Sequence, residues 1–217
     1  MDFDEAQAIA SQYAPSDYYD REYKGMEQMY MPALLSALEE HPAGRVLEIG
    51  PGWGTTAVWL DAKGFDVSVM DLVPVGEFMS QQLIDDYNIN YMHHDLEDSA
   101  LPDGMDIEGF DLIIMTQVIH HLSWRPDRAL RHVGELMNPG ATYLTSVLDR
   151  KSYRRLDSAF GHDWRNVPEW KTTERSSDTI KCMYNEKMFR SLLNNEFSRV
   201  DIWKPKRSTV IFAKATR

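Results

Sequence analysis

The chain has 217 residues, 43% of them hydrophobic and 11% aromatic, with a net charge of −11, and this composition excludes a disordered protein. The single cysteine, Cys182, excludes an internal disulfide and a multi-cysteine zinc site. No apolar run approaches the roughly 18 residues of a membrane span, and the acidic N-terminus does not resemble a secretion signal, so we expect one α/β domain in the cytoplasm.

Apolar stretches alternate with amphipathic ones along most of the chain, which predicts strands alternating with helices. In chain order, we expect a helix over 26–40, a strand over 45–49, a helix over 55–63, a strand over 66–70, a helix over 75–87, strands over 89–92 and 110–115, a helix over 127–137, a strand over 142–148, a helix over 186–195 and strands over 199–204 and 209–214. Asn185 is a suitable N-cap for the helix over 186–195, and Asn138-Pro139-Gly140 should end the helix over 127–137. Together these elements predict a parallel sheet with helices on both faces.

Residues 149–184 break this alternation. They are polar, contain several Arg, Trp and Tyr residues and show no clear periodicity. A loop of this length in a compact domain is usually functional or disordered. We therefore divide the single domain into an N-terminal arm and helix (1–44), a core (45–148), an insertion (149–184) and a C-terminal helix with a strand pair (185–217).

The charge is unevenly distributed between the two halves of the chain. Residues 1–110 carry 22 acidic and 4 basic side chains, whereas residues 111–217 carry 12 acidic and 19 basic ones. Such asymmetry marks either the docking site of an anionic partner or two solvated faces that attract each other. The sequence leaves both interpretations open.

A glycine-rich turn follows the first expected strand. Residues 46–56 read VLEIGPGWGTT, an apolar run that leads into glycines at positions 50, 52 and 54. A turn of this kind brings bare backbone N–H groups against a ligand. A dinucleotide fingerprint would need a glycine at position 55, where this chain has Thr, so the pattern is instead acidic-x-Gly-x-Gly-x-Gly with Glu48 as the acid.

This pattern resembles the first motif of the class I S-adenosylmethionine-dependent methyltransferases. The resemblance covers residues 45–148 through several ordered motifs, and the C-terminal strands more loosely. It implies a Rossmann-like, doubly wound α/β fold with seven strands, mostly parallel with an antiparallel C-terminal strand, to which the N-terminal arm and a cap insertion are added. It also implies S-adenosylmethionine as the cofactor and S-adenosylhomocysteine as the product.

The resemblance assigns the first two strand ends to the methionine and ribose parts of the cofactor. Glu48 and the Gly50, Gly52 and Gly54 turn should hold the methionine portion. Asp71, about 20 residues after the turn, should accept hydrogen bonds from the ribose hydroxyls, with Leu72 beside it. The alternative is a tight turn without a ligand and an ordinary turn aspartate.

The next two strand ends complete the expected cofactor site. The resemblance places Asp95 at the adenine amine and Leu96 against the ring. It places Gln117 and Val118, within the sequence TQVIHHL, close to the sulfonium. We predict no metal site, because adjacent histidine side chains diverge and no matching cluster of acids or cysteines accompanies them.

Methyl transfer to a hydroxyl or an ammonium group needs a proton acceptor, whereas a carboxylate needs none. The candidate bases are His120, His121 and His162, because a histidine titrates near neutral pH.

Aromatic and arginine side chains outside the core are the candidates for binding the acceptor. Such residues crowd the N-terminal arm and the insertion, where the alternative is simple anchoring or covering of the core. The candidates are Tyr18, Tyr19, Tyr23, Arg154, Trp164 and Arg165.

The leading hypothesis is methylation of O or N on a small, anionic or aromatic metabolite, by a monomer or homodimer. The segment after the fourth strand lacks the Asn/Asp-Pro-Pro-aromatic pattern of DNA amino-methylases. The basic second half keeps an RNA or protein methyltransferase as an alternative, although nucleic acid is not the favoured partner. A non-catalytic S-adenosylmethionine-binding regulatory protein is the third reading.

Overall fold

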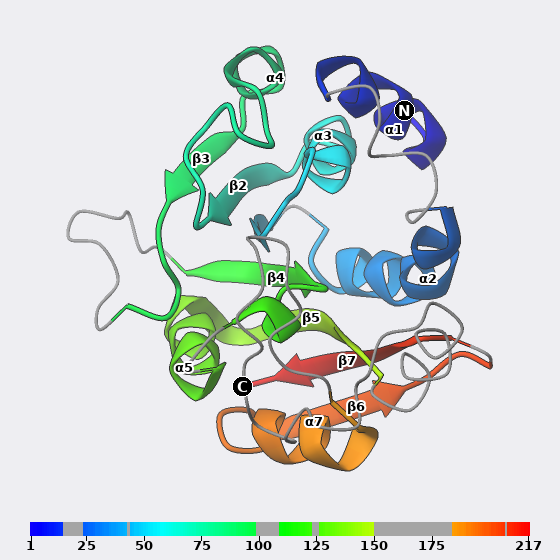
Figure 1. Ribbon diagram of the computed structural model, residues 1–217, viewed down its shortest axis with the longest axis vertical. Coiled ribbons are helices and arrows are strands. Elements are labelled where there is room, and N and C mark those ends of the chain that lie inside the picture. The colour runs from blue at the N-terminus through cyan, green and yellow to red at the C-terminus, as the bar shows by residue number, and fades with distance from the viewer. Residues whose placement is uncertain (15–23, 43, 99–108, 123–125, 150–183, 207) are drawn as a thin grey trace, which may run out of the picture.

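A computed structural model of the chain describes residues 1–14, 24–42, 44–98, 109–122, 126–149, 184–206 and 208–217. Within these residues, seven strands form one sheet in the order β3-β2-β1-β4-β5-β7-β6 (Figure 1). In that order the strands are Asn90–His93, Asp66–Asp71, Arg45–Ile49, Phe110–Thr116, Met137–Leu148, Val210–Thr216 and Arg199–Trp203. The strand β7 pairs antiparallel with β5 and β6, and the remaining described pairs are parallel. The expected doubly wound, mostly parallel sheet is confirmed.

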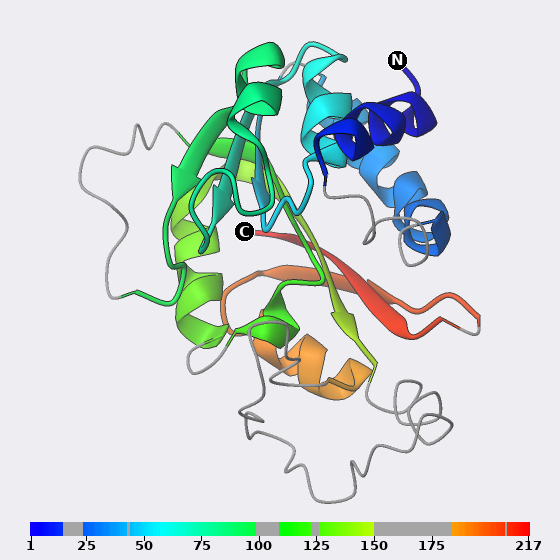
Figure 2. The ribbon, with the colours of Figure 1, turned by 45° about the horizontal axis from the view of Figure 1, so that its top comes forward.

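Helices cover both faces of this sheet (Figure 2). One face carries α1 (Phe3–Tyr13), α2 (Lys24–Glu40), α3 (Thr55–Asp61) and α4 (Gln81–Asp86). The other face carries α5 (Pro126–Leu136) and α7 (Glu186–Leu193). A short 3-10 helix, η1 (Ile119–His121), follows β4.

The central strands are apolar on both sides because each side meets a helical layer. In β4, Leu112 and Ile114 pack with the helices α1–α4, whereas Ile113 and Met115 pack with α5 and α7. All four side chains are fully buried. Successive residues of a strand point to opposite faces, so a continuous apolar run is what a sheet between two layers requires.

The strand order reverses between β1 and β4. The chain winds outward from β1 to β3 in one direction and from β4 to β5 in the other. In open α/β sheets, ligands bind outside the carboxyl ends of the strands at such a reversal. The segments that follow β1, β2, β3 and β4 therefore define the edge on which a site should lie.

Two helices differ from the expected elements. The helix α1 is not among the expected elements: its fully buried side chains are the small Ala6 and Ala10, and the larger Phe3, Ile9 and Tyr13 pack against the core only partly buried. Its start is nevertheless marked by a capping box in which Asp2 and Glu5 bond to each other's backbone N–H at 2.8 Å.

The helix expected over 75–87 is wrong in its first part, since α4 begins only at Gln81. Gly76 has a φ of +96° and donates its N–H to the Met79 carbonyl at 2.9 Å, so the chain makes a turn there. Ser80 then caps the helix by accepting the Leu83 N–H at 3.1 Å.

The other expected boundaries lie within a few residues of the observed ones, except at β5. The segment Asn138-Pro139-Gly140 follows the end of α5 as expected, but β5 starts already at Met137 and includes it. Met137 belongs to the strand because it pairs with Phe110 of β4. The Asn138 side-chain amide adds bonds to the same end of β4, donating to the Gly109 carbonyl and to Asp111 Oδ1 at 3.0 and 2.8 Å.

Candidate active site

The glycine turn after β1 has a backbone that favours glycine. Gly50, Gly52 and Gly54 have φ values of +67°, +53° and +86°, all in the left-handed region. The Gly50 N–H donates to the Met70 carbonyl of β2 at 2.8 Å, and the Gly54 N–H closes the turn onto the Pro51 carbonyl at 2.9 Å. The turn is thus tied to the neighbouring strand and leads directly into α3.

Two of these glycines also lie against side chains from other segments. A Cβ atom on Gly50 would lie 2.4 Å from Val118 Cγ2, and one on Gly54 would lie 2.7 Å from Met79 Cε. Val118 belongs to the segment after β4, and Met79 to the loop before α4. The turn therefore brings the carboxyl end of β1 into contact with the segments that follow β4 and β2.

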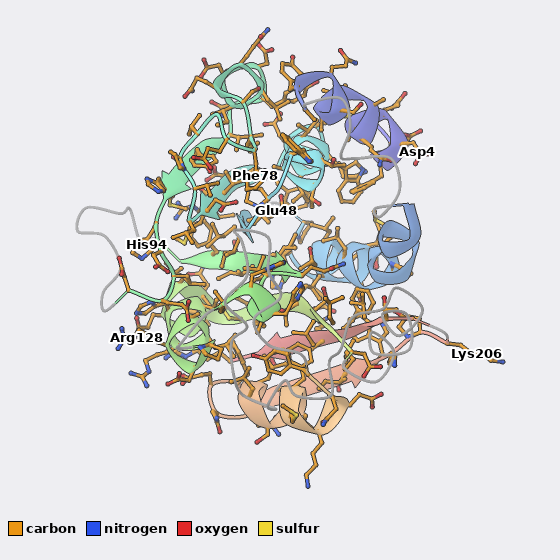
Figure 3. The ribbon with its side chains drawn as sticks, viewed as in Figure 1. Asp4, Glu48, Phe78, His94, Arg128 and Lys206 are labelled. Atoms are coloured by element: carbon orange, nitrogen blue, oxygen red, sulfur yellow. The ribbon has the colours of Figure 1, made fainter. Side chains whose placement is uncertain are left out.

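Glu48 is buried beneath this turn, with 5% of its surface exposed (Figure 3). Its carboxyl accepts hydrogen bonds from the Thr56 side chain and the Ala57 backbone in α3. Burial, opposed by these bonds, raises the pKa of Glu48 to about 8, and the nearby Asp71 also raises it. In the part of the chain that the structure describes, the Oε2 atom of Glu48 has no hydrogen-bond partner.

Asp71 ends β2 beside the glycine turn. Its Oδ1 atom accepts the Val73 N–H at 3.2 Å, and burial raises the pKa of its carboxyl. The next residue, Leu72, is a large apolar side chain that is 62% exposed. Phe78, which is also partly exposed, packs edge-on against Trp53 of the glycine turn with ring centroids 5.7 Å apart.

The segment after β3 lies next to Asp71. The His94 N–H donates to the Asp71 carbonyl at 2.9 Å, and His93 Nε2 lies 2.8 Å from the Leu72 carbonyl oxygen. Asp95 accepts the Glu97 N–H at 2.8 Å, which closes a tight turn. Leu96 is only 5% exposed and belongs to the core beneath α5, so its side chain offers little free surface.

His94 is labelled in Figure 3, at the carboxyl end of β3. Its Nε2 atom is buried and lacks a hydrogen-bond partner among the described residues, and burial lowers the pKa of its imidazole.

The two histidines after β4 differ in their surroundings. His120 is 1% exposed, whereas His121 is exposed, and their ring centroids lie 4.3 Å apart. Burial, and then the proximity of His121, hold the pKa of His120 well below its ordinary value. His120 is therefore neutral at physiological pH, and its Nδ1 atom has no hydrogen-bond partner in the described part of the chain.

Several predicted residues lie outside the described ranges. They are the candidate base His162 and the candidate acceptor-binding residues Tyr18, Tyr19, Tyr23, Arg154, Trp164 and Arg165. Most of the predicted insertion lies there as well. Conversely, Phe78 and Ser146 contact this edge and are not among the residues predicted from the sequence. For Ser146 the available signal is the pair of adjacent hydroxyl residues, Thr145 and Ser146, near the end of β5.

No three His, Cys, Asp or Glu side chains in the described ranges are grouped so that they could hold a metal ion. No helix within them is both long and apolar enough to cross a membrane.

Residues 22–196 match the model of a family described as a methyltransferase domain, and the chain belongs to this family. It is an S-adenosylmethionine-dependent methyltransferase with a class I fold. No curated protein sequence matches it significantly.

Solved structures of low sequence identity share the fold. The PH0226 protein from Pyrococcus horikoshii OT3 is 15% identical, with a TM-score of 0.68 over 98% of both chains. Magnesium protoporphyrin IX methyltransferase (ChlM) from Synechocystis PCC 6803, solved with bound S-adenosylhomocysteine, is 14% identical, with a TM-score of 0.64 over 98% of this chain and 93% of that one. The CurJ carbon methyltransferase is 21% identical, with a TM-score of 0.66 over 98% of this chain and 58% of that one.

Proposed function

We propose that this enzyme methylates O or N of a small, anionic or aromatic metabolite, with the cofactor lying along the carboxyl ends of β1, β2, β3 and β4. The observation that carries the proposal is the convergence of these four strand ends. Gly50 lies against Val118, the Gly50 N–H bonds to β2, and the His94 N–H bonds to the Asp71 carbonyl. Residues that the sequence separates by up to about 70 positions thus form one continuous edge.

The described residues fit the methionine end of the cofactor. The glycine turn places a left-handed backbone at the carboxyl end of β1, and Glu48 beneath it has a buried oxygen without a hydrogen-bond partner among the described residues. A buried polar atom of this kind is stabilised by a hydrogen-bond donor, and the ammonium group of a bound amino acid is one. We assign Glu48 and the turn of Gly50, Gly52 and Gly54 to this end.

The nucleoside end is assigned to the segments after β2 and β3. Asp71 offers a carboxylate to the ribose hydroxyls, and Asp95 offers one to the adenine amine. Leu72 is exposed and Leu96 is buried, so we assign the apolar contact with the adenine ring chiefly to Leu72. Gln117 and Val118 lie across the glycine turn from them and are assigned to the sulfonium end.

When bound, S-adenosylmethionine supplies a methyl group activated for displacement. The protein must align the acceptor and, for a hydroxyl or ammonium acceptor, remove its proton. His121 is the better base of the adjacent pair, because it is exposed and His120 is buried with a strongly lowered pKa. His120 then packs beneath His121 and supports its ring. His162 and the acceptor-binding residues of the arm and the insertion stay predictions.

One observation keeps an RNA acceptor as a second candidate. Residues 111–217 carry 19 basic side chains against 12 acidic ones, and phosphate contacts use Lys and Arg. Binding of RNA with a steep salt dependence would favour this candidate, and no binding at low salt would remove it. Family membership favours either enzyme over a non-catalytic regulatory protein.

The substitution Asp71→Ala tests the assigned site. Loss of the charge-assisted bonds to the ribose should weaken binding of S-adenosylhomocysteine by about 1–3 kcal/mol, as measured by titration calorimetry. The matched control is Asp66→Ala at the opposite end of β2, where Asp66 forms a surface ion pair with Arg45. Equal affinities of the two variants would show that the ribose lies elsewhere.

A further inference from the structure

Gln117 has a backbone conformation that side chains disfavour. Its φ is +58°, in the left-handed region, and the only other described non-glycine residue there is Asn88. This conformation costs a residue with a Cβ atom about 1–2 kcal/mol and persists only where the surrounding structure holds it. Gln117 is the first residue after β4, so whatever holds it also sets the direction of the segment that follows.

Ser146 of β5 holds this conformation. The Gln117 N–H donates to Ser146 Oγ at 3.0 Å and also to the Ser146 carbonyl oxygen at 3.2 Å. Ser146 is fully buried and lies beside Thr116 in the parallel pairing of β4 with β5. The preceding hydroxyl, on Thr145, donates to the Met115 carbonyl at 2.9 Å. The adjacent hydroxyls of Thr145 and Ser146 therefore bond to backbone groups on both sides of Thr116, at the carboxyl end of β4.

The position of Gln117 decides where the next residues lie. Val118 follows at once, with Cγ2 at 2.4 Å from the place of a Cβ on Gly50. The Val118 carbonyl then accepts the His121 N–H at 2.8 Å, which starts η1. A change at Gln117 would therefore alter both the contact with the glycine turn and the placement of the histidine pair.

We propose that Ser146 is a positioning residue of the methyltransferase site. Its hydroxyl holds Gln117 in the left-handed conformation, which sets Val118 against the glycine turn and orients His121 at the sulfonium end. The role is indirect, since Ser146 is buried in β5 beside the end of β4 and acts through Gln117. The inference rests on the proposed function, which places the cofactor and the base on this edge.

The test compares Ser146→Ala with Ser68→Ala. Ser68 is a buried serine of β2, which β1 and β4 separate from β5, and its hydroxyl accepts a bond from the Asn90 side chain at 3.4 Å, so this control removes a hydroxyl from the same sheet away from Gln117. Loss of one hydrogen bond should weaken binding of S-adenosylhomocysteine to Ser146→Ala about 5-fold, and Ser68→Ala should stay close to the wild type. Melting curves recorded beside the titrations show that both variants fold.

A second variant distinguishes positioning from a general structural effect. Glycine adopts a positive φ without strain. The variant Gln117→Gly should therefore keep the left-handed conformation at position 117 without the bond to the Ser146 hydroxyl. In this background the further change Ser146→Ala should alter the affinity less than 2-fold, a coupling that independent structural roles would not produce.

Two results would overturn the proposal. One is equal affinity of Ser146→Ala and Ser68→Ala, and the other is an undiminished effect of Ser146→Ala in the Gln117→Gly background. Failure of the wild-type chain itself to bind S-adenosylhomocysteine would instead overturn the proposed cofactor site, and this inference with it.

Discussion

At the residue scale, Glu48 links the chemistry of the site to the stability of the protein. Its carboxyl is buried under the glycine turn, and its pKa is raised from the ordinary 4.5 to about 8. Between these two pH values the unfolded chain releases the proton and the folded chain keeps it. The free energy of unfolding should therefore fall as the pH rises through this range, by about 1.4 kcal/mol per pH unit at most for one group.

The isosteric change Glu48→Gln should remove this dependence. Relative to the wild type, the variant should gain stability as the pH rises from 4.5 to 8, as measured by urea unfolding at several pH values. The control, Glu135→Gln, removes an exposed carboxyl from α5. Parallel curves for the wild type and Glu48→Gln would contradict the raised pKa of this buried carboxyl.

Gly50 should tolerate no larger residue. The change Gly50→Ala combines a left-handed φ of +67° with a Cβ only 2.4 Å from Val118 Cγ2. We expect a loss of about 2–4 kcal/mol in the free energy of unfolding, from strain and overpacking together, and a loss of cofactor binding.

Gly64→Ala is the matched control, because Gly64 has a φ of +86° but nothing within 4 Å of its Cβ position. Strain alone should cost it about 1–2 kcal/mol and leave binding intact. Equal losses in both variants would contradict the role of the Val118 contact.

At the scale of the elements, α7 begins after an N-cap residue that the sequence predicts. Asn185 was expected as the N-cap, and its Oδ1 atom accepts the Met188 N–H at 2.9 Å. Asn185→Ala should therefore lower the free energy of unfolding by about 1 kcal/mol. Asn194→Ala at the other end of the same helix, also an exposed residue, should change it by only a few tenths. Urea unfolding measures both, and a similar loss in the two variants would contradict the capping role.

The sequence predicted those elements whose local signals agree with the packing. The apolar runs of β1 and β4 are buried on both sides, so their pattern reflects their place in the sheet directly. The start of α4 was misjudged because Gly76 and Ser80 form a turn and a cap within a stretch that has helical spacing. The helix α1 is not predicted because small alanines form the fully buried part of its apolar side, between Phe3 and Tyr13.

The site could be predicted only in part, because some of its contacts join segments that lie far apart in the sequence. Glu48 lies one residue before the end of β1, Asp71 ends β2 and Asp95 follows β3, so their shared edge follows from the parallel sheet. The contact of Val118 with Gly50 and the bond from Gln117 to Ser146 depend on the way two distant segments meet, and no local pattern encodes it. The different burial of His120 and His121 likewise appears only when η1 packs against the core.

At the scale of the whole molecule, the two helical layers cover the faces of the sheet, so we expect the cofactor at the carboxyl ends of the strands. Four strand ends meet there, and the reversal of strand order between β1 and β4 lies among them. The fold and the family define the methyl donor. The acceptor must be recognised by groups beyond this edge, and we expect them in the N-terminal arm and the 149–184 insertion.

The most direct test of the central claim is a calorimetric titration of the wild-type chain with S-adenosylhomocysteine, with melting curves recorded in parallel. We predict one binding site per chain and a rise in melting temperature. A ligand at about 100 times its dissociation constant stabilises the native state by about 2.7 kcal/mol. Absence of both binding heat and thermal stabilisation with the ligand in excess would contradict the assignment of this edge as a cofactor site.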